Sequence, residues 1–171
     1  MHLDLLVPDV GEASRVAEER GATLLGDDGD ARPIYADPVG HPFCLHPGDS
    51  ETPVIGRLVI DCPNPPVLAS FYGDLLVMPR RVEDTPDRVV IAAADDRPPM
   101  LGFQRVSPYV PPTWGDVRSP QQYHFDLRFD DAPASQQRVE RLGALRLTPL
   151  GGTCPVYGDP AGHPFCLCGV E

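Results

Sequence analysis

Apolar runs alternate with helix-like segments in the same order three times along the chain. Runs dense in Leu, Val, Ile and Phe, bounded by turn residues, predict strands at "HLDLLV", "VIGRLVIDC" and "HFDLRF". Each run is followed by a segment with helical spacing of apolar residues, and then by two or three further short apolar runs. The order predicts an α+β protein built from three β-α-β-β-β modules: module 1 (residues 1–48), module 2 (54–106) and module 3 (122–169).

Modules 1 and 3 are copies of one another. Laying Met1 on Tyr123 without a gap matches "HxDL" at the first strand, and it matches the whole phrase "DPxGHPFCL" at the end of each module. Identical residues occupy roughly 18 of about 45 positions in this alignment, far above chance. Module 2 is a divergent third example, and a Pro-rich linker over 107–121 joins it to module 3.

Composition narrows the class of partner. The net charge of −11 argues against nucleic acid and anionic membranes as partners, because binding to either requires clustered cations. No apolar run is long enough to cross a membrane, and the N-terminus does not resemble a secretory signal, so we expect a cytoplasmic protein. The five cysteines are an odd number and fall mostly in apolar runs, which predicts reduced thiols.

Three phrases in chain order resemble landmarks of the vicinal oxygen chelate superfamily, in its glyoxalase-like branch: "LVIDCPNPPVLASFYGDLL", "FQRV…PPTWGD…PQQYHFDL" and "DPAGHPFCL". In that superfamily two such modules curl into an open barrel, or cup, with the helices outside, and the concave face binds a ligand, often through a divalent metal. The resemblance implies that residues 54–171 form one complete two-module domain. It implies that residues 1–48 are the second half of another domain.

A half-domain at 1–48 would expose a sheet edge and an apolar face. We therefore expect two copies of the chain to form a homodimer by pairing their first modules across a two-fold axis. The alignment places Met1 inside a family landmark, which leaves two explanations open: truncation of a four-module ancestor, or a start codon assigned too far downstream.

Strand alternation predicts which side chains face the cup. In "HFDLRF", His124, Asp126 and Arg128 share the face opposite the apolar residues. The same parity places Arg57 and Asp61 of module 2 in the cup. Each histidine and arginine has a second interpretation as part of an internal ion pair, His124 with Asp126, and the arginines with Asp61 or Asp126.

The resemblance assigns four metal-ligand positions to Arg57, Gln104, His124 and Cys166. Only His124, Cys166 and Gln104 have donor atoms for a metal, and Arg57 would repel a cation, so a divalent metal is not favoured and the cofactor stays unknown. His163 and Cys166 are three apart on an extended strand and point to opposite faces, so His163 is interpreted as a turn residue.

The resemblance supports a protein that holds a small oxygenated molecule, with lyase, isomerase or dioxygenase chemistry. His124 would move a proton and Arg57 with Gln104 would hold an oxyanion, while Tyr109 and Trp114 of the linker would cover the cup or simply pack as loop residues. One alternative is a binding or resistance protein without catalysis; another is a degenerate cup kept for assembly. Whether module 1 has its own site around His2, Asp4 and Cys44 is left open.

Overall fold

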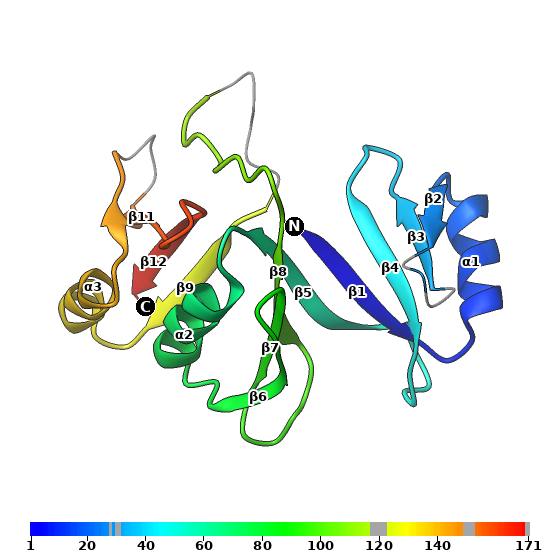
Figure 1. The fold of residues 1–171 in the computed structure, drawn as a ribbon, viewed down its shortest axis with the longest axis horizontal. Helices are drawn as coiled ribbons and strands as arrows, with labels where there is room; N and C mark the ends of the chain where they lie inside the picture. The colour runs from blue at the N-terminus through cyan, green and yellow to red at the C-terminus, as the bar shows by residue number, and fades with distance from the viewer. Residues whose placement is uncertain (28, 30–31, 117–122, 149–152, 170–171) are drawn as a thin grey trace.

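The computed structural model describes residues 1–27, 29, 32–116, 123–148 and 153–169, and it contains the three expected modules (Figure 1). Module 1 consists of β1 (His2–Val7), α1 (Val10–Glu19), β2 (Thr23–Asp27), β3 (Pro33–Ala36) and β4 (Pro42–Pro47). Module 2 consists of β5 (Val54–Cys62), α2 (Pro65–Leu76), β6 (Arg80–Asp84), β7 (Arg88–Ala92) and β8 (Met100–Arg105). Module 3 consists of β9 (Phe125–Phe129), α3 (Ala132–Arg141), β10 (Leu145–Arg146), β11 (Val156–Gly158) and β12 (Pro164–Gly169).

Modules 1 and 2 share one open, eight-stranded sheet in the order β2-β3-β4-β1-β5-β8-β7-β6. The two halves join where β1 pairs antiparallel with β5, and Asp4 stands opposite Arg57. The prediction that residues 1–48 lack a partner within the chain is therefore wrong. β1 has β4 on one side and β5 on the other, so module 1 cannot dimerise through this strand edge.

Module 3 forms a separate four-stranded sheet in the order β10-β11-β12-β9. Among the described residues β9 pairs with β12, whereas both edges of β5 are taken by β1 and β8. The expected single cup over residues 54–171, with β5 beside the first strand of module 3, is not formed. The strand that completes the cup of module 2 comes from module 1.

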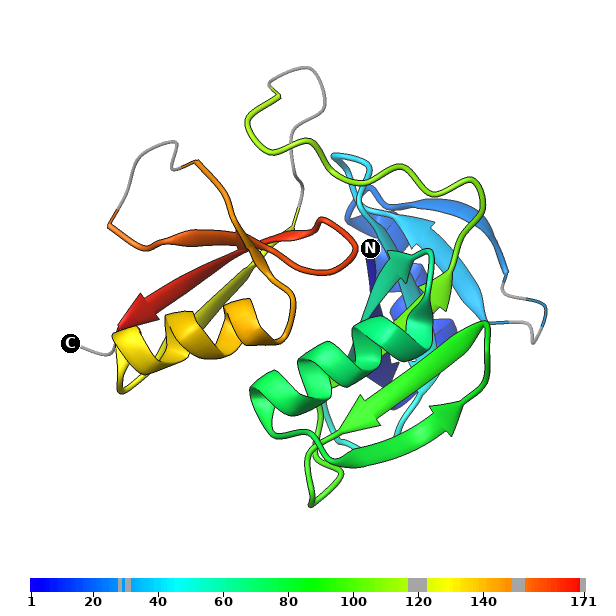
Figure 2. The ribbon, with the colours of Figure 1, turned by 60° about the vertical axis from the view of Figure 1, so that its left-hand side comes forward.

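Modules 2 and 3 instead pack through their apolar, helix-covered faces (Figure 2). One core cluster contains Leu68, Phe71 and Tyr72 of α2 together with Val139 of α3 and Phe165 of β12. The ring centroids of Phe71 and Phe165 are 6.1 Å apart. This apolar packing, rather than a shared sheet, holds modules 2 and 3 together.

A buried hydrogen bond fixes the same interface. The Tyr72 hydroxyl donates to Asp159 Oδ2 at 3.0 Å, and both residues are buried. Burial, followed by the negative charge of Asp159, raises the pKa of Tyr72 well above its usual value, so the hydroxyl remains a donor. The bond ties the long helix of module 2 to the last turn of module 3.

Each helix begins at a side-chain cap that the sequence supplies. Asp9 accepts from the Glu12 amide and Asp131 from the Ala134 amide, while Asn64 accepts from the Val67 amide at the start of α2. No helix in the described part of the chain has the length and apolar character that crossing a bilayer requires.

The repeated phrase "DPxGHPFCL" forms the same turn in both copies. Asp159 accepts hydrogen bonds from the amides of Ala161 and His163, and its carboxylate lies 2.9 Å from His163 Nδ1. Asp37 makes the same contacts to Val39 and His41. The interpretation of His163 as a turn histidine is confirmed, because its ring is bonded to Asp159 and faces the Tyr109 hydroxyl.

The prediction of five reduced cysteines is wrong for two of them. Cys154 and Cys168 are joined by a disulfide bond, whereas Cys44, Cys62 and Cys166 are in no disulfide within the described part of the chain and keep their thiols. In titration of the denatured protein with a thiol reagent we expect three reactive thiols without reductant and all five after reduction, since the chain has five cysteines. Five thiols before reduction would contradict the disulfide.

Candidate functional site

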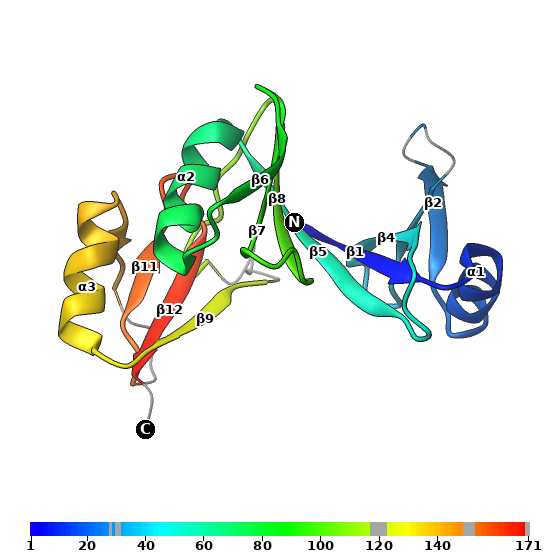
Figure 3. The same ribbon diagram turned by 90° about the horizontal axis from the view of Figure 1, so that it is seen from below.

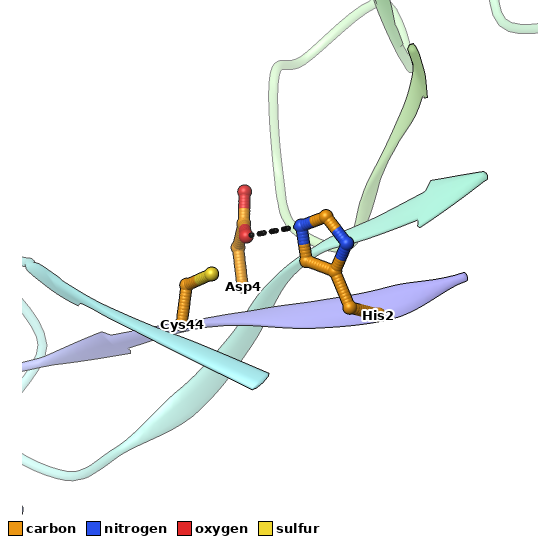
Figure 4. Close-up of side chains that lie close together, drawn as sticks. All are labelled: His2, Asp4 and Cys44. Carbon is orange, nitrogen blue, oxygen red and sulfur yellow. Dashed lines mark ion pairs between the residues drawn. The ribbon is translucent and has the colours of Figure 1, made fainter. Parts of the chain in front are cut away.

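The cup face of the eight-stranded sheet is the face opposite α1 and α2. Alternation along the paired strands brings Asp4 beside Cys44 on β4 and beside Arg57 on β5. On the other half of the sheet Gln104 of β8 stands between Asp61 of β5 and Arg88 of β7. Figure 4 shows the side chains of His2, Asp4 and Cys44 rising from the same side of β1 and β4.

Asp4 is the centre of this face. It is 2% exposed, and its Oδ1 lies 3.4 Å from His2 Nε2 and 3.3 Å from His46 Nε2. Its Oδ2 lies 3.4 Å from Arg57 Nε and 3.9 Å from Arg88 Nη2, and it makes no hydrogen bond of good geometry to another described group. Four cationic or ionisable side chains thus surround one buried carboxylate.

These neighbours keep the carboxylate ionised. Burial by itself would raise the pKa of Asp4, but the close contacts with the His2 and His46 rings and the positive charge of Arg57 together hold that pKa well below its ordinary value. The ionised Asp4 carboxylate orients the rings of its two histidine neighbours. It also holds the two guanidinium groups at the surface of the cup.

A second polar group lies along the cup face in module 2. Asp61 accepts a hydrogen bond from Gln104 Nε2 at 2.7 Å, and its other oxygen lies 2.8 Å from the Met1 amino group. Arg88 also contacts Glu83 at 3.2 Å. Arg57, Arg88 and Asp61 each keep between a quarter and a third of the side chain exposed, so they are accessible from the cup.

The structure divides the predicted site residues between two sheets. Arg57, Asp61 and Gln104 lie together on the cup face of modules 1 and 2. His124, Asp126, Arg128 and Cys166 lie on module 3, where Cys166 stands opposite Asp126. The prediction that Arg57 and His124 face the same cup is therefore wrong. The first strand of a module that pairs with β5 is β1 of module 1, not β9 of module 3.

On module 3 the predicted residues form a more open group. His124 Nε2 lies 3.2 Å from Asp126 Oδ1, with 45% and 65% of the two side chains exposed. This is the internal pairing that was the alternative interpretation of His124. Burial, followed by the hydrogen bond to Asp126, raises the pKa of the Cys166 thiol, so Cys166 is not an activated nucleophile.

The linker aromatics pack on module 3. The Tyr109 hydroxyl donates to the Ala161 carbonyl at 2.8 Å, and Trp114 Nε1 donates to the Thr148 carbonyl at 2.7 Å. These bonds correspond to the loop-packing interpretation of both residues.

Sequence reasoning missed His46 and Arg88 and left His2, Asp4 and Cys44 undecided. The internal repeat could have pointed to His2 and Asp4, since they are the counterparts of His124 and Asp126. It could not show which of the two copies lies beside β5.

The metal that the superfamily often uses does not fit the cup well. His2, Asp4 and Cys44 offer donor atoms within 4.8 Å of one another, as do His124, Asp126 and Cys166. In the first group, however, Arg57 and Arg88 already lie on the same carboxylate, and a divalent cation would sit beside two fixed positive charges. The second group is largely exposed and belongs to one module only. We assign no metal to either.

Comparison with known proteins agrees with this architecture. A sequence model of the family described as "Glyoxalase-like domain" matches residues 1–46 and 57–168, nearly the whole chain. The chain belongs to the glyoxalase-like family. This places it in the vicinal oxygen chelate superfamily, and the predicted α+β fold with an open curved sheet is confirmed. No curated protein sequence matches the chain significantly.

Solved structures share the family's fold at low identity. Glyoxalase I from Zea mays is 19% identical with a TM-score of 0.68, and the match covers 98% of this chain and 66% of that one. A glyoxalase/bleomycin resistance protein/dioxygenase family enzyme from Burkholderia phytofirmans is 13% identical with a TM-score of 0.51, covering 68% of this chain and 98% of that one. This glyoxalase-like chain thus spans just under two thirds of the length of the maize protein.

Proposed function

We propose that the cup of modules 1 and 2 binds a small oxygenated organic anion and catalyses a proton transfer on it, as a lyase or isomerase. The observation that carries the proposal is the buried, ionised Asp4 with His2 and His46 on one oxygen and Arg57 and Arg88 near the other. Buried charge arranged in this way is costly to maintain in a fold and is typical of a functional site.

The arginines supply the binding contacts. Arg57 and Arg88 have further N–H groups that can donate to a ligand carboxylate or to an enolate oxygen while the guanidinium groups stay oriented by Asp4. The charge that develops on an enolate oxygen in the transition state would then meet donors that are already in place.

His2 is the candidate proton carrier. Its side chain is 17% exposed, against 8% for His46, so His2 has the better access from the cup. The Asp4 carboxylate at 3.4 Å orients the ring and stabilises the imidazolium that forms when His2 takes a proton from carbon next to a carbonyl group. The same proton can be returned to a neighbouring atom, which completes an isomerisation.

The test combines a ligand screen with two variants. Carboxylates, 2-oxo acids and thiol adducts of methylglyoxal are screened by thermal shift, and we expect at least one compound to stabilise the protein. Arg57→Met should weaken binding of that compound about 10- to 100-fold, as expected for loss of a charged hydrogen bond. Arg97→Gln, which removes an exposed arginine outside the cup, should bind it normally.

A second variant separates catalysis from binding. His2→Ala should still bind the stabilising compound but should lose turnover by about 100-fold or more. Binding by the wild type without turnover of any compound would favour the alternative of a non-catalytic binding or resistance protein. If no compound binds, or if Arg57→Met binds as tightly as the wild type, the proposed site is wrong.

A further inference from the structure

Module 1 carries an open apolar groove on the face opposite the cup. The groove lies between α1 and the strands β1 and β4 and has a volume of about 430 Å³. Its lining is mainly aliphatic and aromatic, and includes Leu5, Val7, Phe43 and Leu45 from the sheet and Val16 and Ala17 from α1. Val16 is 41% exposed, and a contiguous apolar surface of this kind is uncommon unless something covers it.

The internal repeat shows what covers this face in the other copy. Leu5 and Phe43 are partly exposed in module 1, whereas their counterparts in module 3, Leu127 and Phe165, are both buried. The counterpart of Ala17 is Val139, which is fully buried. They belong to the core cluster that module 3 shares with module 2.

The covering element is thus another β-α-β-β-β module packed face to face. Module 2 already has module 3 on its helix-covered face, so among the described residues no further module is left to cover module 1 in the same way. Figure 3 shows α1 at the far end of the molecule from α2 and α3. We propose that module 1 of a second copy covers the groove, so that two chains associate through their α1 faces around a two-fold axis.

The charges at the rim suit this arrangement. Glu12 lies at the N-terminal end of the groove, where it also pairs with Arg15 of its own helix at 2.6 Å, and Arg20 lies at the C-terminal end. A two-fold axis near Ala17, between these ends, runs the two α1 helices antiparallel, and Arg20 of each copy then faces Glu12 of the other. Isologous pairing therefore buries the apolar lining and joins opposite charges at both ends.

Light scattering coupled to size exclusion at about 50 µM protein tests the proposal. We expect a mass of twice 18.6 kDa for the wild type. Ala17→Arg should return the mass to that of one chain, because it buries two unpaired guanidinium groups near the axis. Val39→Arg, on the exposed turn of module 1, should leave the dimer intact. Circular dichroism melting confirms that both variants fold.

Exchanging the charges of Glu12 and Arg20 provides a second test, and loss of folding could not produce the expected result. Glu12→Arg and Arg20→Glu should each raise the dimer dissociation constant about tenfold or more, and the double variant should restore it. A wild-type monomer at 50 µM, or a dimer that tolerates Ala17→Arg, overturns the proposal. Single charge variants that weaken the dimer without rescue in the double variant overturn the two-fold arrangement.

Discussion

Replacing Asp4 by Asn should lower the free energy of unfolding at pH 7 by about 3 kcal/mol. The change leaves Arg57 and the neighbouring imidazoles of His2 and His46 without their carboxylate at a position that is 2% exposed. An unpaired charge in such a place costs far more than a surface ion pair contributes. Urea unfolding followed by circular dichroism measures the loss.

The repeat supplies a matched control. Asp126 is the counterpart of Asp4 and also lies near a histidine, but its side chain is 65% exposed. Asp126→Asn should therefore change stability by no more than about 0.5 kcal/mol. Equal effects of the two substitutions would contradict the assignment of Asp4 as the centre of a buried charge cluster.

The pH dependence of the same variant gives an independent test. The pKa of Asp4 is lower in the folded protein than in the unfolded chain, where it is about 3.9. The stabilisation is therefore complete above about pH 5 and is lost as the pH falls towards the folded pKa, because the unfolded state takes up the proton first. Between pH 5 and pH 2.5 the wild type should lose more stability than Asp4→Asn, which cannot titrate at this position.

Replacing Phe165 by Ala should cost about 3–5 kcal/mol of unfolding free energy. Phe165 is fully buried where module 3 meets module 2, and its ring lies against both Phe71 and Tyr157. The substitution removes contacts on both sides of the interface, and the residual cavity is enclosed by two rigid sheets with their helices. Thermal and urea unfolding measure the loss.

Leu145→Ala in the same module serves as the control. Leu145 is 72% exposed and should tolerate the change within about 0.5 kcal/mol. If Phe165→Ala unfolds only module 3, the urea transition separates into two steps, whereas joint unfolding of modules 2 and 3 keeps one step. A loss below about 1 kcal/mol would contradict the packing of module 3 on module 2.

The elements of the fold could be predicted because their signals are local. Apolar alternation marks β1, β5 and β9, and the side chains of Asp9, Asn64 and Asp131 cap the helices that follow. The Asp-Pro-x-Gly turn is likewise formed by residues within a few positions of one another. The disulfide between Cys154 and Cys168 was missed because the odd cysteine count and the apolar context favoured free thiols.

The parity of each strand was also sufficient to select polar residues of the cup. Arg57, Asp61 and Gln104 do share a face as alternation predicts. The alternation of side chains does not reveal, however, which module supplies the strand that lies beside β5. His2 with Asp4 and His124 with Asp126 satisfy the same pattern, so the prediction placed His124, rather than His2, beside Arg57.

The sequence by itself determined the module type, its three repetitions, the helix caps, the turns and the polar face of each strand. Only the tertiary structure decided that β1 rather than β9 lies beside β5, and therefore that Asp4 is buried among cations while Asp126 remains exposed. The physical reason is that local patterns specify a strand and its two faces, whereas the choice between two near-identical strands depends on how the modules pack. Here the apolar face of module 3 is buried against α2, and module 1 supplies the strand that extends the sheet.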